Sequence, residues 1–240
     1  YAAGDPEDFP VVACGQYTSE PDYWERVRRR TEGKASAYHL IFPEVYLKDG
    51  GFDERIRSIN QTMGEYLNRP VFVKHPHSLI YVRRYLQNGS VRRGLVGRID
   101  LEEYDYMAGS QSKIRATEGT VLERIPPRVK IREHASLELP HVMLLIDDPQ
   151  KTVIEPLEQW ADSQPPAYSF SLMENSGKLE GFLLSEEEIR RVLASLLEME
   201  EKAAETAGEH APLPYAVGDG NHSLATARQC YLNLKETLGE

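Results

Sequence analysis

The sequence predicts an α+β fold, a mixed β-sheet flanked by helices, from three observations. Segments whose apolar residues recur at helical spacing alternate with short strand-like runs. Two pairs of such runs are separated by glycine-containing turns, which is the pattern of β-hairpins. Near the end of the chain, Gly218-Asp219-Gly220 separates an apolar run from a helix-forming segment. At 240 residues, the chain is long enough for one sizeable domain or two small ones.

The N-terminal quarter of the chain is predicted to contain two strands and two helices. Residues 9–14 form a short apolar run typical of a buried strand, and residues 38–47 form a second one. A helix begins near Ser19, a capping residue type followed by an early proline, and ends near Gly33. The next helix spans residues 52–67, where apolar side chains recur at helical spacing (Ile56, Ile59, Met63 and Leu67).

Two β-hairpins are predicted further along the chain. Residues 79–87 and 90–101 are joined by Asn88-Gly89, the signature of a type I′ turn. Residues 168–173 and 178–184 flank a second polar, glycine-containing turn. Each hairpin therefore supplies two paired strands to the predicted fold.

Three other segments complete the predicted elements. Residues 109–135 are polar with mixed charges, a composition typical of a functional segment or of a disordered one. Residues 139–146 are almost continuously apolar, which predicts a strand buried on both faces in the middle of a mixed sheet. Ser185 precedes three glutamates and begins a long helix with a capping box.

The most informative segment is the strand, glycine turn and helix start at residues 215–231. Such a junction leaves backbone N–H groups unpaired beside the positive end of a helix, with His222 and Ser223 at the opening. It suits an anionic ligand, and phosphate is the most common one. Gly218 and Gly220 are expected to supply positive φ angles and a close backbone approach.

A second interpretation of this turn is purely structural. The segment lacks the Gly-Lys-Ser/Thr ending of a Walker loop and the third glycine of a dinucleotide fingerprint. In this interpretation the turn is a simple junction in which Asp219 or Asn221 caps the following helix.

Composition excludes several classes of protein. A formal net charge of −10 argues against a nucleic acid as the main partner but leaves room for a small nucleotide. No apolar run approaches the roughly 20 residues of a bilayer span, and the N-terminus lacks the plan of a signal peptide. Cys14 and Cys230 form no disulfide framework, so we expect a reducing, cytoplasmic compartment and an inert Cys14. No spacing defines metal ligands, and oligomeric state is not encoded in any pattern.

The glycine turn and several other segments resemble one known family. The segment Gly-Asp-Gly-Asn-His-Ser-Leu-Ala-Thr-Ala resembles the signature of domain-of-unknown-function family 1015, whose members more typically have Ala-Asp-Gly-His-His-Arg there. Five further segments resemble one branch of the family in the same order along the chain (residues 11–19, 40–47, 92–97, 115–120 and 140–148). The likeness therefore covers nearly the whole chain.

The resemblance implies a fold. Parts of the family are similar to the ParB/sulfiredoxin fold, so it implies a single domain over residues 1–240 with a ParB/sulfiredoxin-like core and insertions. The hairpin and helix at about 165–210 are then an insertion. The chain ends at Glu240 soon after a helix, which is compatible with truncation at the C-terminus.

The resemblance also implies an activity, because the family is related to enzymes that phosphorylate free L-serine with a nucleotide. It implies a kinase that uses ADP or ATP with Mg²⁺ on a small hydroxyl-bearing metabolite such as serine. Glu118, matched together with Thr120, is the first candidate for the catalytic carboxylate, and Asp219 is the second. The implied phosphate-binding residues are those of the turn (Gly218, Gly220, Asn221, His222 and Ser223).

Two departures from the family pattern favour an alternative, a non-catalytic nucleotide- or phosphate-binding sensor or scaffold. Ser223 replaces an arginine that would bind phosphate in a bidentate way, and Gly15 replaces an acidic residue. Arg228 or Arg115 are candidates to compensate for the missing arginine. A ParB-like role on DNA conflicts with the negative charge, and a sulfiredoxin-like reductase would need a cysteine where His222 stands.

Overall fold

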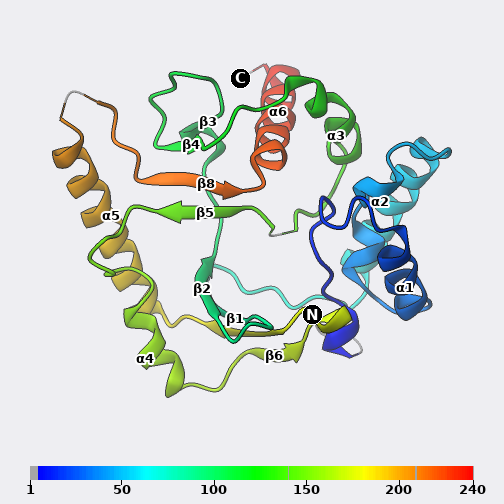
Figure 1. The fold of residues 1–240 in the computed structure, drawn as a ribbon, viewed down its shortest axis with the longest axis horizontal. Helices are drawn as coiled ribbons and strands as arrows, with labels where there is room; N and C mark the ends of the chain where they lie inside the picture. Colours follow the sequence, from blue (N-terminus) through cyan, green and yellow to red (C-terminus); the bar gives the residue numbers. More distant parts are fainter. Residues whose placement is uncertain (1–4, 140, 209, 240) are drawn as a thin grey trace.

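The computed structural model describes residues 5–139, 141–208 and 210–239. These residues form two four-stranded β-sheets and six α-helices (Figure 1). The α+β class predicted from the sequence is confirmed. The prediction of one sheet is wrong, because the strands divide into an antiparallel sheet and a separate mixed sheet.

The antiparallel sheet is built from the two predicted hairpins. Its strands are β1 (Ile80–Tyr85), β2 (Val91–Val96), β6 (Tyr168–Ser171) and β7 (Lys178–Leu183), arranged in the order β2-β1-β7-β6. Strand β7 of the second hairpin pairs with β1 of the first, so segments far apart in sequence form one continuous sheet. Residues 165–210 therefore provide half of this sheet and the helix that follows it.

The turn of the first hairpin differs from the predicted type. A type I′ turn needs positive φ at both central residues, but here only Gly89 has one (φ 81°). The Leu86 N–H donates to the Ser90 carbonyl at 2.9 Å, which closes a longer loop with Gly89 in the left-handed conformation. The glycine was correctly placed, and the loop is longer than a two-residue turn.

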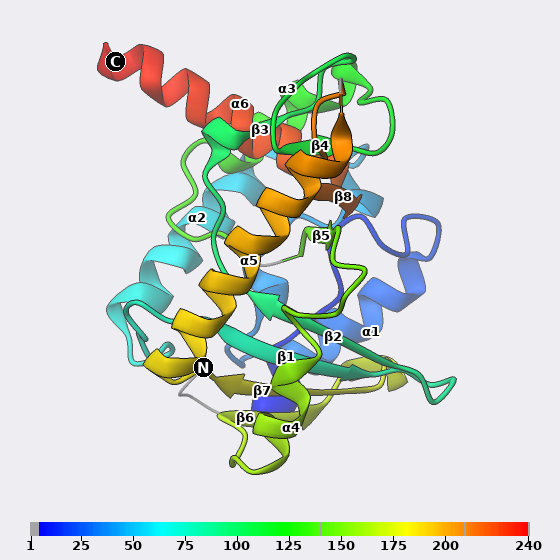
Figure 2. The ribbon, with the colours of Figure 1, turned by 90° about the vertical axis from the view of Figure 1, so that its left-hand side faces the viewer.

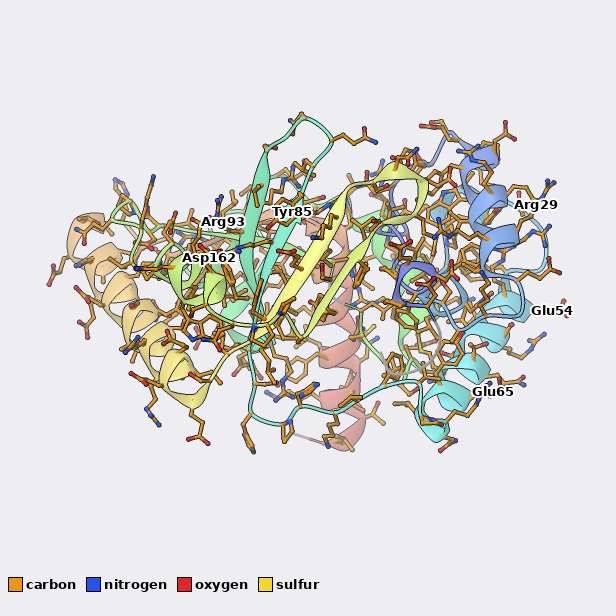
Figure 3. All side chains as sticks on the ribbon, turned by 90° about the horizontal axis from the view of Figure 1, so that it is seen from below. Arg29, Glu54, Glu65, Tyr85, Arg93 and Asp162 are labelled. Atoms are coloured by element: carbon orange, nitrogen blue, oxygen red, sulfur yellow. The ribbon has the colours of Figure 1, made fainter. Side chains whose placement is uncertain are left out.

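Helices α4 (Pro156–Asp162) and α5 (Glu186–Ala207) cover the antiparallel sheet. Their buried side chains share one core with those of β1 and β7 (Tyr81, Val153, Leu157, Ala161, Phe182, Val192 and Met199). Arg83 on β1 is buried and pairs with Asp162 of α4 at 2.7 Å. Figure 3 shows Asp162 and Arg93 close together beside α4, whereas Arg29, Glu54 and Glu65 point outward from the opposite flank.

Helix α5 connects the two sheets. Its Ser185 Oγ accepts a hydrogen bond from the Glu188 N–H at 3.2 Å, which confirms the predicted N-terminal cap. The helix runs diagonally along the side of the molecule from one sheet to the other (Figure 2). Leu193 and Leu197 are 50% and 62% exposed, so only part of its apolar surface is covered in this chain.

The mixed sheet has the strand order β3-β4-β8-β5. Its strands are β3 (Tyr104–Asp105), β4 (Ile114–Ala116), β5 (Met143–Ile146) and β8 (Tyr215–Asp219). Strand β8 runs parallel to β4 and antiparallel to β5. The predicted central position of residues 139–146 is wrong, because β5 is an edge strand and its Leu145 is 60% exposed.

The N-terminal quarter contains helices α1 (Pro21–Thr31) and α2 (Phe52–Asn68) but neither predicted strand. Residues 9–14 and 38–47 are joined by an isolated backbone hydrogen bond, which the Glu44 N–H donates to the Cys14 carbonyl at 2.9 Å. Each segment contains a proline, which has no N–H to donate to the hydrogen-bond ladder of a β-sheet. In place of a strand, the second segment contains 3₁₀ turns at Ala37–Leu40 and Glu44–Tyr46.

The last pair of helices, α3 (Ile125–Arg132) and α6 (Asn221–Leu238), pack against each other above the mixed sheet (Figure 1). Ile125 and Val129 of α3 share a small core with Ala225 of α6. The polar stretch 109–135 is thus ordered, and its two prolines occupy the first turn of α3, where a missing N–H costs little. No helix in the described ranges has both the length and the apolar character needed to span a bilayer.

Candidate functional site

The junction between β8 and α6 has the predicted form of strand, glycine turn and helix. Gly220 precedes the helix with φ 90° and ψ 27°, a left-handed conformation that favours glycine. The expectation for Gly218 is wrong, since this residue belongs to the strand and has no positive φ. Its missing Cβ instead makes room for Leu145, whose Cγ lies 2.9 Å from the position that a Cβ would take.

The first turn of α6 leaves backbone donors open. The first intrahelical bond runs from the Leu224 N–H to the Gly220 carbonyl at 2.9 Å. No side chain caps the helix, so neither Asp219 nor Asn221 has the capping role of the structural interpretation. Within the described ranges, the N–H groups of Asn221, His222 and Ser223 have no protein acceptor. Unpaired donors at the positive end of a helix favour an anionic partner.

The Asn221 side chain holds the neighbouring loop instead of facing outward. Asn221 is buried; its Oδ1 accepts from the Thr117 N–H at 3.3 Å and its Nδ2 donates to Glu118 Oε1 at 3.2 Å. Thr117 Oγ1 also donates to the Val217 carbonyl at 2.6 Å. These bonds bring Glu118, the first catalytic candidate, to the start of α6. Asp219, the second candidate, is exposed at the end of β8.

His222 is a neutral hydrogen-bond acceptor in this arrangement. Its Nε2 accepts from the Val121 N–H at 3.1 Å, which requires a lone pair on that nitrogen. Burial lowers the pKa of His222 below its ordinary value, and the positive charges of Arg124 and Arg128 lower it further. The negative charges of Glu118 and Glu44 raise this pKa by less than the other causes lower it. His222 thus positions the loop at residues 117–121, and positive charge at the site comes from arginine.

The Ser223 side chain is engaged by two other residues. Arg132 Nη1 donates to the Ser223 carbonyl at 2.7 Å and to Ser223 Oγ at 3.0 Å. His141 Nε2 lies 2.5 Å from the same Oγ. An arginine therefore reaches this position from α3, although the sequence position itself carries serine.

Three arginines of the α3 segment were missed by the sequence analysis. Arg124, Arg128 and Arg132 follow one another at four-residue spacing, which places them on one face of a helix. Arg128 pairs with Glu44, and Arg132 pairs with Glu138 at 2.8 Å. Arg124 is exposed and has no ion-pair partner in the part of the chain that the structure describes. The spacing was visible in the sequence, but nothing in it showed that this face meets α6.

The two arginines proposed to compensate for Ser223 lie elsewhere. Arg115 donates to the carbonyls of Ala211 and Pro212 at 3.2 and 3.1 Å, and Arg228 donates to the Leu101 carbonyl. Both guanidinium groups therefore hold loops together away from the start of α6.

A loop of the N-terminal region also reaches the site. Glu44 Oε1 lies 3.6 Å from the point where a Cβ on Gly15 would be, so a carboxylate lies close to Gly15, the position where the family resemblance led us to expect an acidic residue. Burial raises the pKa of the Cys14 thiol, which keeps it protonated and agrees with the expectation of an inert cysteine. Thr120 Oγ1 is buried in the loop beside His222 and has no hydrogen-bond partner among the described residues.

Among the residues that the structure describes, protein side chains alone form no metal centre at this site. The described residues contain no group of three or more His, Cys, Asp or Glu side chains arranged to hold a metal ion. Mg²⁺ is commonly held by one or two carboxylates together with phosphate oxygens, so a smaller set of protein donors would be enough for it. Two surface cavities, of about 720 and 580 Å³, lie elsewhere, between α4 and α5 and between α1 and α2.

Comparison with known proteins places the chain in a family without an assigned activity. Residues 2–239 match the family described as "Protein of unknown function (DUF1015)". The chain belongs to this family. No curated protein matches it. No solved structure matches it either.

Proposed function

We propose that the N-terminus of α6 binds the phosphate groups of a nucleotide. The observation that carries this proposal is the set of open N–H groups on Asn221, His222 and Ser223, which no side chain caps. Backbone donors at the positive end of a helix are a common phosphate site in proteins. Gly220 contributes the left-handed conformation with which the chain enters the helix.

Local charge supports an anionic ligand in a protein whose net charge is −10. Arg124, Arg128 and Arg132 approach the site from α3. Glu44 and Glu138 offset two of these charges and hold their side chains in place. Arg124 is left as the charge best able to pair with a phosphate.

The proposed activity is a small-molecule kinase that uses ADP or ATP on a hydroxyl-bearing metabolite such as serine. The family resemblance supplies this expectation, and the position of Glu118 beside the open amides supports it. Glu118 would accept the proton of the attacking hydroxyl, and Asp219, the other carboxylate, would hold Mg²⁺ together with phosphate oxygens. The metal neutralises phosphate charge when bound; phosphoryl transfer otherwise depends mainly on positioning.

A non-catalytic nucleotide sensor or scaffold is the second candidate. It is favoured by the observation that the side chains of Asn221, His222 and Ser223 already hold other parts of the protein. Within the turn itself, only backbone donors are then left for the ligand, with Arg124 as a neighbouring charge. This is enough for binding but places no additional side chain against a transferred phosphoryl group.

Turnover separates the two candidates. ATP or ADP is incubated with L-serine and the purified chain, and phosphoserine is measured by ³¹P NMR. Glu118→Gln keeps an oxygen that can accept from Asn221 but removes the base, so the kinase proposal predicts a loss of at least about 100-fold. Glu123→Gln, at an exposed residue of the same segment, is the matched control and keeps wild-type turnover. Nucleotide binding without turnover supports the sensor, and no binding contradicts both.

A further inference from the structure

Ser223 and His141 form a pair that the proposed kinase mechanism does not use. Ser223 lies in the first turn of α6, and His141 lies just before β5, 82 residues away in sequence. His141 Nε2 is 2.5 Å from Ser223 Oγ, and His141 Nδ1 is 2.7 Å from the Leu139 carbonyl oxygen.

The direction of the hydrogen bonds follows from their chemistry. A carbonyl oxygen only accepts, so the proton of the neutral imidazole lies on Nδ1 and is donated to Leu139. Nε2 then carries the lone pair, and the Ser223 hydroxyl donates to it. This is the geometry in which a histidine removes the proton of a serine nucleophile, with the ring oriented by a third group.

Arg132 adds a positive charge to the same oxygen. Its Nη1 donates to Ser223 Oγ at 3.0 Å, and its other nitrogens are fixed by Glu138 at 3.1 and 2.8 Å. A guanidinium in this position stabilises negative charge on Oγ. Packing of α3 on α6 does not need the hydroxyl, because Arg132 Nη1 also donates to the Ser223 carbonyl at 2.7 Å.

We propose that Ser223 is a nucleophile, with His141 as its general base, toward the phosphorus of a phosphate ester or anhydride held at the start of α6. Oγ forms a bond to phosphorus while its proton passes to His141 Nε2. The bond from phosphorus to the leaving oxygen breaks, and that oxygen keeps the electron pair. The product is phosphoserine at residue 223. The inference rests on the proposed phosphate site, because the open amides are what bring phosphorus to Oγ.

A phosphorylating probe tests the nucleophile without a nucleotide. The full chain is treated with diisopropyl fluorophosphate, whose phosphorus–fluorine bond breaks as fluoride leaves, and adducts are mapped by mass spectrometry. We expect one adduct, on Ser223, because its Oγ is the hydroxyl that lies against His141 Nε2. Ser223→Ala abolishes it, and His141→Gln slows it by at least about 100-fold. Ser185→Ala removes a helix-capping serine without a histidine partner and leaves labelling unchanged.

The possible outcomes are distinct from those of the nucleotide experiments. A folded wild-type chain without an adduct, or an adduct that persists in Ser223→Ala, overturns the inference. If Ser223→Ala fails to fold, adduct mapping on the wild type and the slower labelling of His141→Gln decide the question. Nucleotide binding without labelling supports the phosphate site and contradicts the role of Ser223 as a nucleophile. Labelling without nucleotide binding contradicts the proposed nucleotide site and shows that Ser223 is reactive.

Discussion

At the residue scale, Gly220 combines two constraints that a substitution would violate together. Its φ of 90° is unfavourable for a residue with a Cβ, and that Cβ would lie 3.1 Å from Val142 Cγ2. We therefore predict that Gly220→Ala lowers the free energy of unfolding by more than the roughly 1–2 kcal/mol of a left-handed conformation alone. Urea unfolding of the wild type and of Gly220→Ala measures this difference in the free energy of unfolding.

Gly33→Ala provides the matched control for this prediction. Gly33 also has a positive φ, 71°, but a Cβ there meets no atom within 4 Å. The loss of stability in Gly33→Ala therefore measures the cost of a left-handed backbone alone, without a steric contact. Equal losses in the two variants would show that the contact with Val142 contributes nothing.

His222 gives the site a predicted pH dependence. Its pKa in the folded protein lies below the ordinary 6.5, chiefly through burial and then through Arg124 and Arg128. The stability contributed by neutral His222 is complete above the unfolded value and is lost as pH falls through the lower folded value. We predict that wild-type stability falls more steeply from pH 7 to 5 than that of His222→Gln. Urea unfolding across this range measures both, and parallel curves would contradict the assignment.

The residues of the site were only partly predictable from sequence. The positive φ of Gly220 followed from a short local pattern, and so did the open start of the helix. The roles of Asn221 and Ser223 did not, because their partners Glu118, Arg132 and His141 are about 80 to 100 residues away. Which side chains fill a turn depends on packing between distant segments, which a single sequence does not reveal.

At the element scale, the start of α5 offers a direct test of a cap. Ser185 Oγ accepts from the Glu188 N–H at 3.2 Å, and removing such a cap costs about 1 kcal/mol. We predict that Ser185→Ala lowers the free energy of unfolding by that amount. Ser195→Ala, within the same helix, is the control and is expected to change stability by under about 0.5 kcal/mol. A similar effect of both variants would argue against the cap.

Helices and hairpins were predictable because their signals are local. Apolar spacing located α2, capping residue types located α1 and α5, and a glycine-containing turn located each hairpin. Strands that depend on distant partners were not: the two N-terminal strands are absent, and β5 lies at an edge. Whether an apolar run forms a buried strand, an edge strand or no strand depends on the segments that pack beside it, and these are not visible in the run itself.

At the scale of the whole molecule, the candidate site is assembled from segments spread along the chain. The start of α6 contacts the loop at residues 117–121, helix α3 and His141, and Arg128 of α3 pairs in turn with Glu44. Figure 1 shows α3 beside α6. The division into two sheets follows from the pairing of β1 with β7 and of β4 with β8. Both are long-range pairings, which explains why neither could be predicted from periodicity. Whether the core is ParB/sulfiredoxin-like stays a prediction.

The central claim is that the open amides at the start of α6 bind phosphate, and amide NMR during titration with ATP or ADP tests it most directly. We predict saturable shifts of the Asn221, His222 and Ser223 amide resonances. The first turn of α5, where Ser185 already caps the helix, provides an internal control and should not shift. Nucleotide binding that leaves residues 221–223 unshifted, or no binding at all, would contradict the account.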